Sequence, residues 1–292
     1  MLIPIKRVLK RILFAKYTHA FWDKDGSNWG DALNPVLIEY LSGRPARFAS
    51  GRGTEKYLVV GSILSKADSH SEVWGAGFIR KDETVLERPR VIHAVRGPLS
   101  HAQLFSQGID SPRVFGDPAL LLPQFFNPDI EGQYDVGIVP HYEDKKHPWV
   151  DRLRADPAVR VIDVEGNIFD FVKEIKSCDV ILSSSLHGLI CADAYGVPSL
   201  WIELSDRVIG AGFKFRDYFA SVDREVHAPV RPSLDAPLSK IVAKADRYRI
   251  NIDLRRLMLS CPFLQRALRS KFEREESYAR AVSGRPIAGQ DA

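Results

Sequence analysis

The chain is short of cysteine and of long apolar runs, and each shortage excludes a class of protein. Its 292 residues include only three cysteines, and no two of them have the spacing of a zinc-binding pair. This odd, scattered set argues against a disulfide framework or a metal site and favours a reducing compartment. No apolar run reaches the ~18–20 residues that a membrane-spanning helix needs. Charges interrupt the apolar beginning of the chain, so we expect no signal peptide and a cytoplasmic location.

The chain also lacks the strong charge excess of a nucleic-acid-binding protein. Its formal net charge is +4, and arginines of the C-terminal region alternate with acidic residues, so we expect no nucleic acid partner. Basic residues do gather in 3–16, where apolar and basic side chains fall on different faces of a predicted helix. Two interpretations stay open. The helix lies on the anionic inner face of the plasma membrane, or it is an ordinary surface helix with a solvated basic face.

Short apolar, β-branched segments alternate with helical patterns along most of the chain. These segments lack polar alternation, which is typical of strands buried on both faces in a parallel sheet. Such strands are predicted at residues 57–60, 72–74, 90–95, 135–139, 159–162, 179–182 and 199–202. Alternating strands and helices indicate βαβ units, in which ligands bind beyond the carboxyl ends of the strands. The predicted fold class is therefore α/β.

A polar, proline-containing stretch over 122–133 is the best candidate for a linker. It divides the chain into two predicted Rossmann-like domains, an N-terminal one over 1–125 and a C-terminal one over 133–245. The remaining segment, 246–292, is rich in arginine and leucine. We expect it to form helices that pack across the domains and to end in a flexible tail.

The first polar motif, Asn28-Trp29-Gly30-Asp31, follows a strand-like stretch and begins a helical pattern. Its plain interpretation is a helix start that Asp31 caps. Its functional interpretation is a close approach to a ligand that Gly30 permits, with Asn28 and Asp31 facing sugar hydroxyls or moving protons.

Two further polar residues are candidates in the first half. Arg96 stands at a strand end, where its guanidinium can hold a carboxylate or phosphate, or pair with an acidic neighbour such as Asp117. Asp117, within Gly116-Asp117-Pro118-Ala119, caps a short helix as readily as it contacts a ligand.

The strongest candidate is Ser183-Ser184-Ser185-Leu186-His187-Gly188, where a buried strand leads into a helix. Free amides at a helix start favour an anion, and a histidine beside them can pair with that anion or transfer a proton. The alternative is that His187 only satisfies the helix end. Further along, Lys214 and Arg216 follow a glycine-bearing loop, where they suit phosphate or carboxylate capture or form a solvated helix face.

Taken in order over residues 28–218, these motifs resemble those of the polysaccharide pyruvyl transferase family. The resemblance is carried by Asn28-Trp29-Gly30-Asp31, Arg96-Gly97 with Ser100, Gly116-Asp117-Pro118-Ala119, Ser184-Ser185-Leu186-His187-Gly188, Gly196-Val197-Pro198 and Lys214. The Ser-Leu-His version is similar to the branch that adds pyruvate ketals to xanthan and succinoglycan. The implied fold is GT-B-like, with two Rossmann-like domains facing across a cleft.

The resemblance also implies a reaction. The donor is phosphoenolpyruvate, no cofactor or metal is needed, and phosphate leaves as a ketal forms on two hydroxyls of a sugar in a lipid-linked exopolysaccharide unit. The N-terminal domain is then the acceptor side and the C-terminal domain the donor side, with His187 and Asp31 as catalytic residues. The donor-binding candidates are Ser183, Ser184, Ser185, Gly188, Lys214, Arg216 and Arg96. The acceptor-binding candidates are Asn28, Gly30 and Asp117.

One position departs from the family pattern. Many members carry arginine immediately before Leu-His, where this chain has Ser185. Another cation must then serve the donor, and the candidates are Lys214, Arg216, Arg96 and Arg207.

Two other functions fit the same sequence. A GT-B glycosyltransferase that uses a nucleotide sugar would share the architecture, and Glu203, just past a strand, could hold its ribose. A non-catalytic saccharide-binding or assembly protein would account for the basic N-terminal helix and for the missing arginine at position 185.

Overall fold

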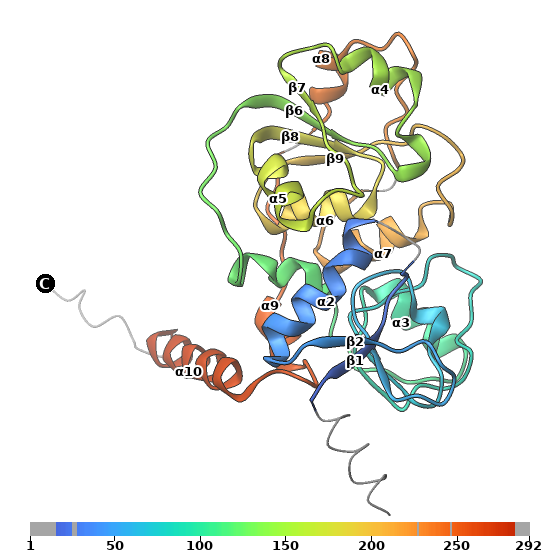
Figure 1. Ribbon diagram of the computed structural model, residues 1–292, viewed down its shortest axis with the longest axis vertical. Helices are drawn as coiled ribbons and strands as arrows, with labels where there is room; N and C mark the ends of the chain where they lie inside the picture. The colour runs from blue at the N-terminus through green and yellow to red at the C-terminus, as the bar shows by residue number, and fades with distance from the viewer. Residues whose placement is uncertain (1–15, 25–27, 227, 246, 284–292) are drawn as a thin grey trace, which may run out of the picture.

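The computed structural model describes residues 16–283, apart from 25–27, 227 and 246. In this part the chain forms two parallel sheets surrounded by helices (Figure 1). The predicted α/β class is therefore confirmed. The predicted basic helix over 3–16 falls outside the described residues except for its last position, and so does the end of the predicted tail.

The first sheet has five parallel strands in the order β2-β1-β3-β4-β5. They are β1 (Thr18–Phe21), β2 (Ala46–Phe48), β3 (Lys56–Leu58), β4 (Ser71–Trp74) and β5 (Val91–Ala94). β3, β4 and β5 lie where an apolar run predicts a strand, and β1 overlaps the strand-like stretch before Asn28. β2 is an edge strand of three residues with an exposed arginine at its centre, so its sequence carries no buried-strand pattern.

The second sheet has four parallel strands in the order β7-β6-β8-β9. They are β6 (Tyr134–Val139), β7 (Val159–Val161), β8 (Cys178–Ser183) and β9 (Ser199–Trp201), each at a predicted position. The register places Ser183 beside both Val139 and Trp201. The chain segments that leave β6, β8 and β9 therefore meet at one carboxyl edge.

Helices flank and connect the sheets. They are α2 (Trp29–Ser42), α3 (Pro98–Ser106), α4 (Pro148–Leu153), α5 (Ile168–Lys176), α6 (Leu186–Ala194), α7 (Phe213–Ser221), α8 (Leu238–Val242), α9 (Leu254–Leu259) and α10 (Arg266–Ser283). Short 3-10 helices are η1 (Leu64–Lys66), η2 (Pro118–Gln124) and η3 (Tyr142–Asp144). Between η2 and β6 the chain is irregular, as the proline-containing stretch predicts. None of the helices in the described ranges has the length and apolar character to cross a bilayer.

Helices also cross between the two halves of the chain. α2 packs on α5, where the Trp29 and Phe171 ring centroids lie 5.3 Å apart and Trp29 Nε1 donates to the Ile168 carbonyl at 3.1 Å. α7 follows the second sheet but packs against α3 of the first half. α9 returns to the first sheet, where Trp74 Nε1 donates to the Leu257 carbonyl at 3.0 Å. These crossings connect the two halves of the chain (Figure 1).

Candidate active site

A polar pocket of about 160 Å³ lies where segments leaving the carboxyl ends of both sheets come together. Its walls come from the loops after β1, β3, β4, β6 and β8 and from the first turns of α2, α6 and α7. The lining residues are Asp23, Asn28, Asp31, Gly61, Ser62, Ile63, Ile79, His141, Tyr142, Ser185, Leu186, His187 and Lys214. Larger hollows occur elsewhere, including one of about 460 Å³ at the amino ends of β1 and β3. We assign the site to the smaller pocket, because parallel sheets bind ligands beyond the carboxyl ends of their strands.

Asn28 and Asp31 enter the pocket from the start of α2. Asn28 Oδ1 accepts hydrogen bonds from the backbone N–H groups of Gly30 at 3.1 Å and Asp31 at 3.3 Å, and Asn28 Nδ2 donates to Asp31 Oδ2. Asn28, rather than Asp31, therefore caps the helix. Burial raises the pKa of the Asp31 carboxyl to about 7, although the hydrogen bond from Asn28 opposes this shift. A carboxyl group with this pKa exchanges its proton near neutral pH.

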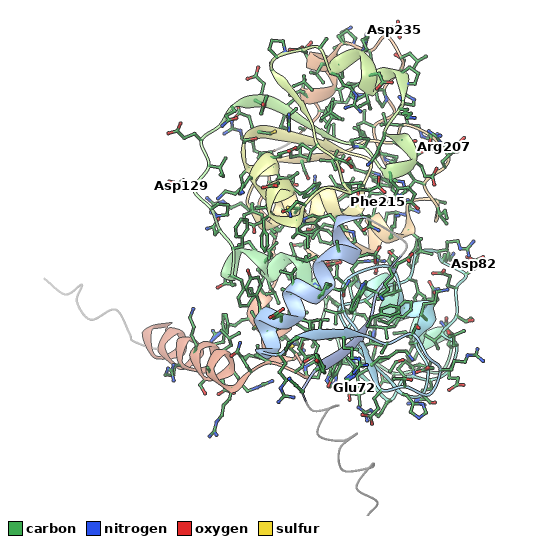
Figure 2. The ribbon with its side chains drawn as sticks, viewed as in Figure 1. Glu72, Asp82, Asp129, Arg207, Phe215 and Asp235 are labelled. Carbon is green, nitrogen blue, oxygen red and sulfur yellow. The ribbon has the colours of Figure 1, made fainter. Side chains whose placement is uncertain are left out.

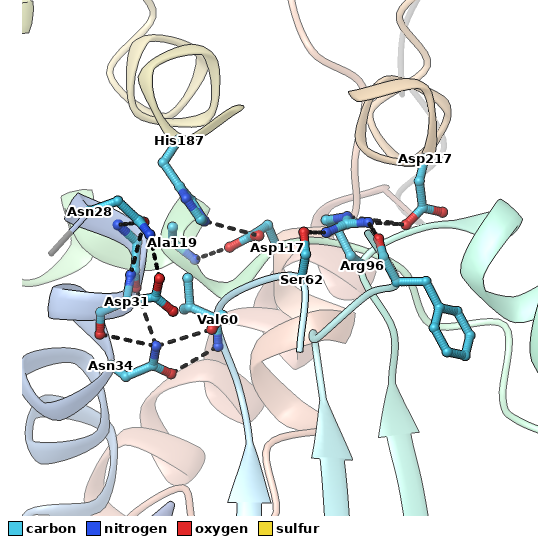
Figure 3. A network of polar contacts seen from close by, with 12 residues as sticks. Asn28, Asp31, Asn34, Val60, Ser62, Arg96, Asp117, Ala119, His187 and Asp217 are labelled. Carbon is cyan, nitrogen blue, oxygen red and sulfur yellow. Dashed lines mark hydrogen bonds and ion pairs between the residues drawn. The ribbon is translucent and has the colours of Figure 1, made fainter. Parts of the chain in front are cut away.

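Asn34 ties the helix that carries Asp31 to the first sheet. Asn34 Nδ2 donates to the Val60 carbonyl and Asn34 Oδ1 accepts from the Val60 N–H, each at 3.0 Å (Figure 3). Val60 leads directly into Gly61 and Ser62, which line the pocket. Asn34 thus fixes two walls relative to each other. Sequence reasoning missed it, because an asparagine inside a helix gives no local sign of its partner.

Only one of the three serines after β8 lines the pocket. Ser183 Oγ accepts from the N–H of Ser185 at 3.0 Å, and Ser184 Oγ accepts from the N–H of His141 at 2.8 Å. Gly188 is packed as well, since a Cβ there would stand 2.4 Å from Ser183 Oγ. Ser183, Ser184 and Gly188, predicted to bind the donor, lie in the turn that presents Ser185, outside the pocket lining.

His187 reaches the pocket from the first turn of α6, with its ring packed on Gly30. Gly30, predicted to contact the acceptor, lies beneath this ring and is absent from the pocket lining. Burial, together with the nearby cations Lys214 and Arg96, lowers the pKa of His187 to about 3, so the imidazole is neutral at neutral pH. Its buried Nε2 has no hydrogen-bond partner among the described residues and lies 3.9 Å from Asp117 Oδ2 (Figure 3).

Gly30→Ala tests this close packing. Alanine normally stabilises a helix by about 1 kcal/mol relative to glycine. Here, however, the added Cβ would stand 2.0 Å from His187 Cε1. We therefore expect Gly30→Ala to displace the imidazole and to lower the melting temperature instead of raising it.

Thermal unfolding followed by circular dichroism checks the sign, and a crystal structure of the variant checks the ring position. Gly132→Ala is the control, because a Cβ at that position meets nothing closer than 3.7 Å. A Gly30→Ala protein that melts higher than wild type, with the ring unmoved, would contradict the interpretation.

Lys214 is the cation of the pocket. It lies in the first turn of α7, is 9% exposed, and forms no hydrogen bond or ion pair with any residue of the described ranges. Burial and the neighbouring Arg96 lower the pKa of its ammonium group to about 8, against the opposing effect of Asp31. The group therefore remains mostly charged at neutral pH. Its described contact is with the Phe215 ring, whose centroid lies 5.6 Å from Nζ, so an anionic ligand could still bind the ammonium group.

Arg96 does not reach the pocket, because its side chain is fully buried in an ion pair with Asp217. Its Nε and Nη2 approach Asp217 Oδ2 at 3.1 and 3.0 Å, and its Nη1 donates to Ser62 Oγ at 2.8 Å (Figure 3). Asp217 also accepts hydrogen bonds from the backbone N–H and the hydroxyl of Ser100, at 2.9 and 2.7 Å. Arg96, predicted to bind the donor, joins the first half of the chain to α7 at Asp217, less than one turn beyond Lys214.

Asp117 and Arg216 also lie outside the pocket lining. Asp117, predicted as an acceptor contact and as a possible partner of Arg96, is fully buried and caps η2 by accepting from the Ala119 N–H at 3.0 Å. Arg216, predicted to bind the donor, donates from Nη2 to the Ala211 carbonyl at 2.5 Å. Of the candidates to replace the missing arginine, Lys214 alone belongs to the pocket lining.

His141 and Tyr142 line the pocket but were not predicted. They follow β6 directly, and their ring centroids lie 4.1 Å apart. Burial lowers the pKa of His141 to about 4, with Lys214 as the next cause, so this imidazole is also neutral. The signal was present in the sequence: a histidine follows the end of a buried strand, as His187 does.

The fold and the pocket define an α/β protein with a polar site between two parallel sheets. Residues 71–206 match the model of the family described as polysaccharide pyruvyl transferase. The chain is similar to an uncharacterised protein of Acanthamoeba polyphaga mimivirus, at 30% identity over 56% of this chain and 59% of that protein. It is also similar to the succinoglycan biosynthesis protein ExoV of Rhizobium meliloti, at 28% identity over 68% of this chain and 62% of that protein.

The matched segments thus cover about six tenths of the length of each of these relatives. Together the comparisons confirm the resemblance to the polysaccharide pyruvyl transferase family that the ordered motifs indicate.

Proposed function

We propose that this protein transfers a pyruvyl group from phosphoenolpyruvate to two hydroxyls of an exopolysaccharide sugar, where it forms a ketal and releases phosphate. The family match and the relative named for succinoglycan biosynthesis support this class of reaction. The observation that carries the proposal is the content of the pocket. It combines the exchangeable carboxyl of Asp31, the buried ammonium of Lys214 and the neutral imidazole of His187.

The proposed chemistry needs an acid, a base and a cation. Protonation of the methylene carbon of phosphoenolpyruvate produces a methyl group and an oxocarbenium-like centre, which one sugar hydroxyl attacks with loss of its proton. The second hydroxyl then attacks the same carbon and loses its proton as phosphate leaves. Asp31 and His187 are our candidates for moving these protons. Lys214 is our candidate for holding the donor anion, in place of the arginine that Ser185 replaces.

The GT-B-like arrangement is part of the proposal. His187 and Lys214 come from the second half of the chain, which suits a donor side over 133–245. Asn28 and Asp31 come from the first half, which suits an acceptor side over 1–125. We further propose a lipid-linked acceptor and a cytoplasmic enzyme, held at the inner membrane face through residues 3–16.

Two measurements test the proposal. Thermal-shift titration should show stabilisation by phosphoenolpyruvate, and an assay with an acceptor glycan should show phosphate release that requires both substrates. Stabilisation by a nucleoside diphosphate but not by phosphoenolpyruvate would favour a glycosyltransferase. Glu203, the residue that would hold a ribose, is ion-paired with Arg231 and lies outside the pocket lining.

Asp31 gives the reaction a predicted pH dependence. As a base it acts when deprotonated, so kcat/KM should rise with pH through about 7, and Asp31→Asn should lose this limb of the profile. The stability of the fold depends on pH in the opposite direction, because the folded state binds the Asp31 proton more tightly than the unfolded chain does. This group therefore makes folding less favourable as pH rises from 3.8 to about 7.

The measurement is a kcat/KM profile for wild type, Asp31→Asn and the exposed-site control Asp110→Asn. An unchanged alkaline rise in Asp31→Asn would remove Asp31 from the proton transfers.

A further inference from the structure

Two buried polar atoms face each other behind the pocket, and neither has a hydrogen-bond partner among the described residues. They are Nε2 of His187 and Oδ2 of Asp117, 3.9 Å apart. Buried polar atoms without hydrogen-bond partners are rare. Each has lost the hydrogen bonds that it makes with water in the unfolded chain, and this loss destabilises the folded state. The two side chains come from different halves of the chain, His187 from α6 and Asp117 from the residue before η2 (Figure 3).

Capping of η2 explains only one of the two carboxyl oxygens of Asp117. Oδ1 accepts from the Ala119 N–H at 3.0 Å, and an asparagine could do the same. Arg96 is the cation with the strongest influence on Asp117, but its guanidinium donates to Asp217, to Ser62 Oγ and to the Phe78 carbonyl. Oδ2 is therefore left to His187.

We propose that Asp117 is a positioning residue for His187: its carboxylate accepts a hydrogen bond from Nε2–H, and this leaves Nδ1 as the basic nitrogen that receives a proton from an acceptor hydroxyl. The catalytic half of this inference rests on the proposed function. In a neutral histidine, a hydrogen bond made by one ring nitrogen decides which of the two nitrogens carries the proton. The gap of 3.9 Å must close by about 1 Å to form that bond. Such bonds are often long before substrate binds and shorten in the complex.

The protonation states agree with this arrangement. Burial raises the pKa of Asp117 to about 6 and lowers that of His187 to about 3, so at neutral pH a carboxylate faces a neutral imidazole. The charged groups around the pair are Lys214 and Arg96 beside His187, and Arg96 and Asp217 beside Asp117.

Asp117→Asn isolates the proposed role. The amide oxygen can keep the bond from the Ala119 N–H, and this places Nδ2 and its hydrogens opposite His187 Nε2. Nε2 of His187 must then accept a hydrogen bond from the amide, so the ring proton moves to Nδ1. Nδ1 is then no longer free to accept a proton from the acceptor hydroxyl. We expect kcat to fall by about 100-fold or more while KM for phosphoenolpyruvate stays within a few-fold. Asp129→Asn, an exposed site at the outer edge of the molecule (Figure 2), is the matched control and should behave as wild type.

The tautomer itself is measured by ¹⁵N NMR of histidine-labelled protein, with His187 assigned by the signal that His187→Gln removes. We expect a neutral ring protonated on Nε2 in wild type and on Nδ1 in Asp117→Asn. If Asp117→Asn does not fold, Asp117→Ser keeps the cap and withdraws the charge, and it should also lose the Nε2–H preference. A wild-type ring protonated on Nδ1, or an Asp117→Asn enzyme within about threefold of wild-type kcat, overturns the inference.

The spectra separate this inference from the proposed function. If wild type releases no phosphate from phosphoenolpyruvate, the proposed function fails, yet the NMR result still decides whether Asp117 orients His187. If wild type is active and the tautomer does not depend on Asp117, only the inference fails.

Discussion

His187→Ala is expected to lower kcat for pyruvyl transfer by about 10²–10⁴-fold, the usual cost of removing a group that transfers protons. The imidazole is held on one side by Gly30 and faces Asp117 on the other. Steady-state phosphate release at saturating phosphoenolpyruvate measures the effect. The melting temperature of the variant must be determined in parallel, because the ring fills a buried space.

His70→Ala provides the comparison, since His70 is an exposed histidine of the first half and lies outside the pocket lining. It should keep both turnover and stability. A His187→Ala enzyme that retains near-normal turnover would exclude the imidazole from the mechanism.

Asp217→Ala is expected to destabilise the protein by about 3–5 kcal/mol, because it leaves the Arg96 guanidinium charged, buried and without its carboxylate. Both side chains of this pair are 0% exposed. Asp217 also accepts two hydrogen bonds from Ser100, which are lost at the same time. The expected result is a fall in melting temperature on the order of 10 °C.

A double variant, Arg96→Met with Asp217→Leu, separates the ion pair from the burial of charge. Replacing a buried pair by apolar residues of similar volume is often neutral, so this variant should recover much of the lost stability. Asp235→Ala, at an exposed carboxylate far from the pair (Figure 2), is the control. A melting temperature of Asp217→Ala within one or two degrees of wild type would show that the ion pair is dispensable.

The strands could be predicted from the sequence because their signal is local. Runs such as Val136-Gly137-Ile138-Val139 contain no polar alternation, and a strand buried on both faces requires this pattern. Short β2 was missed for the same reason, since an edge strand needs no such run. The pocket was also partly predictable, because parallel strands deliver Ser185 and His187 to one edge.

The partners of buried polar groups could not be predicted. Asp217 stands 121 positions from Arg96 in the chain, and sequence pattern favoured the nearer Asp117. The shifted pKa values of Asp31 and Lys214 depend on burial, which arises only when both halves pack together. Ser183 and Ser184 were predicted as ligand contacts because the sequence shows no partner for their hydroxyls. These partners, the Val139 carbonyl and the His141 N–H, come close only when β6 and β8 pair.

The return of the C-terminal segment to the first sheet affects how the protein is made. The Trp74 indole N–H donates a hydrogen bond to the carbonyl of Leu257, and the backbone N–H of Gln265 donates to the Leu41 carbonyl at 2.8 Å. During synthesis the ribosome therefore finishes the first sheet long before it produces the residues that cover it. Until then the Trp74 indole and the end of α2 lack these partners, so we expect the nascent N-terminal half to be prone to aggregate before residues 254–265 are made.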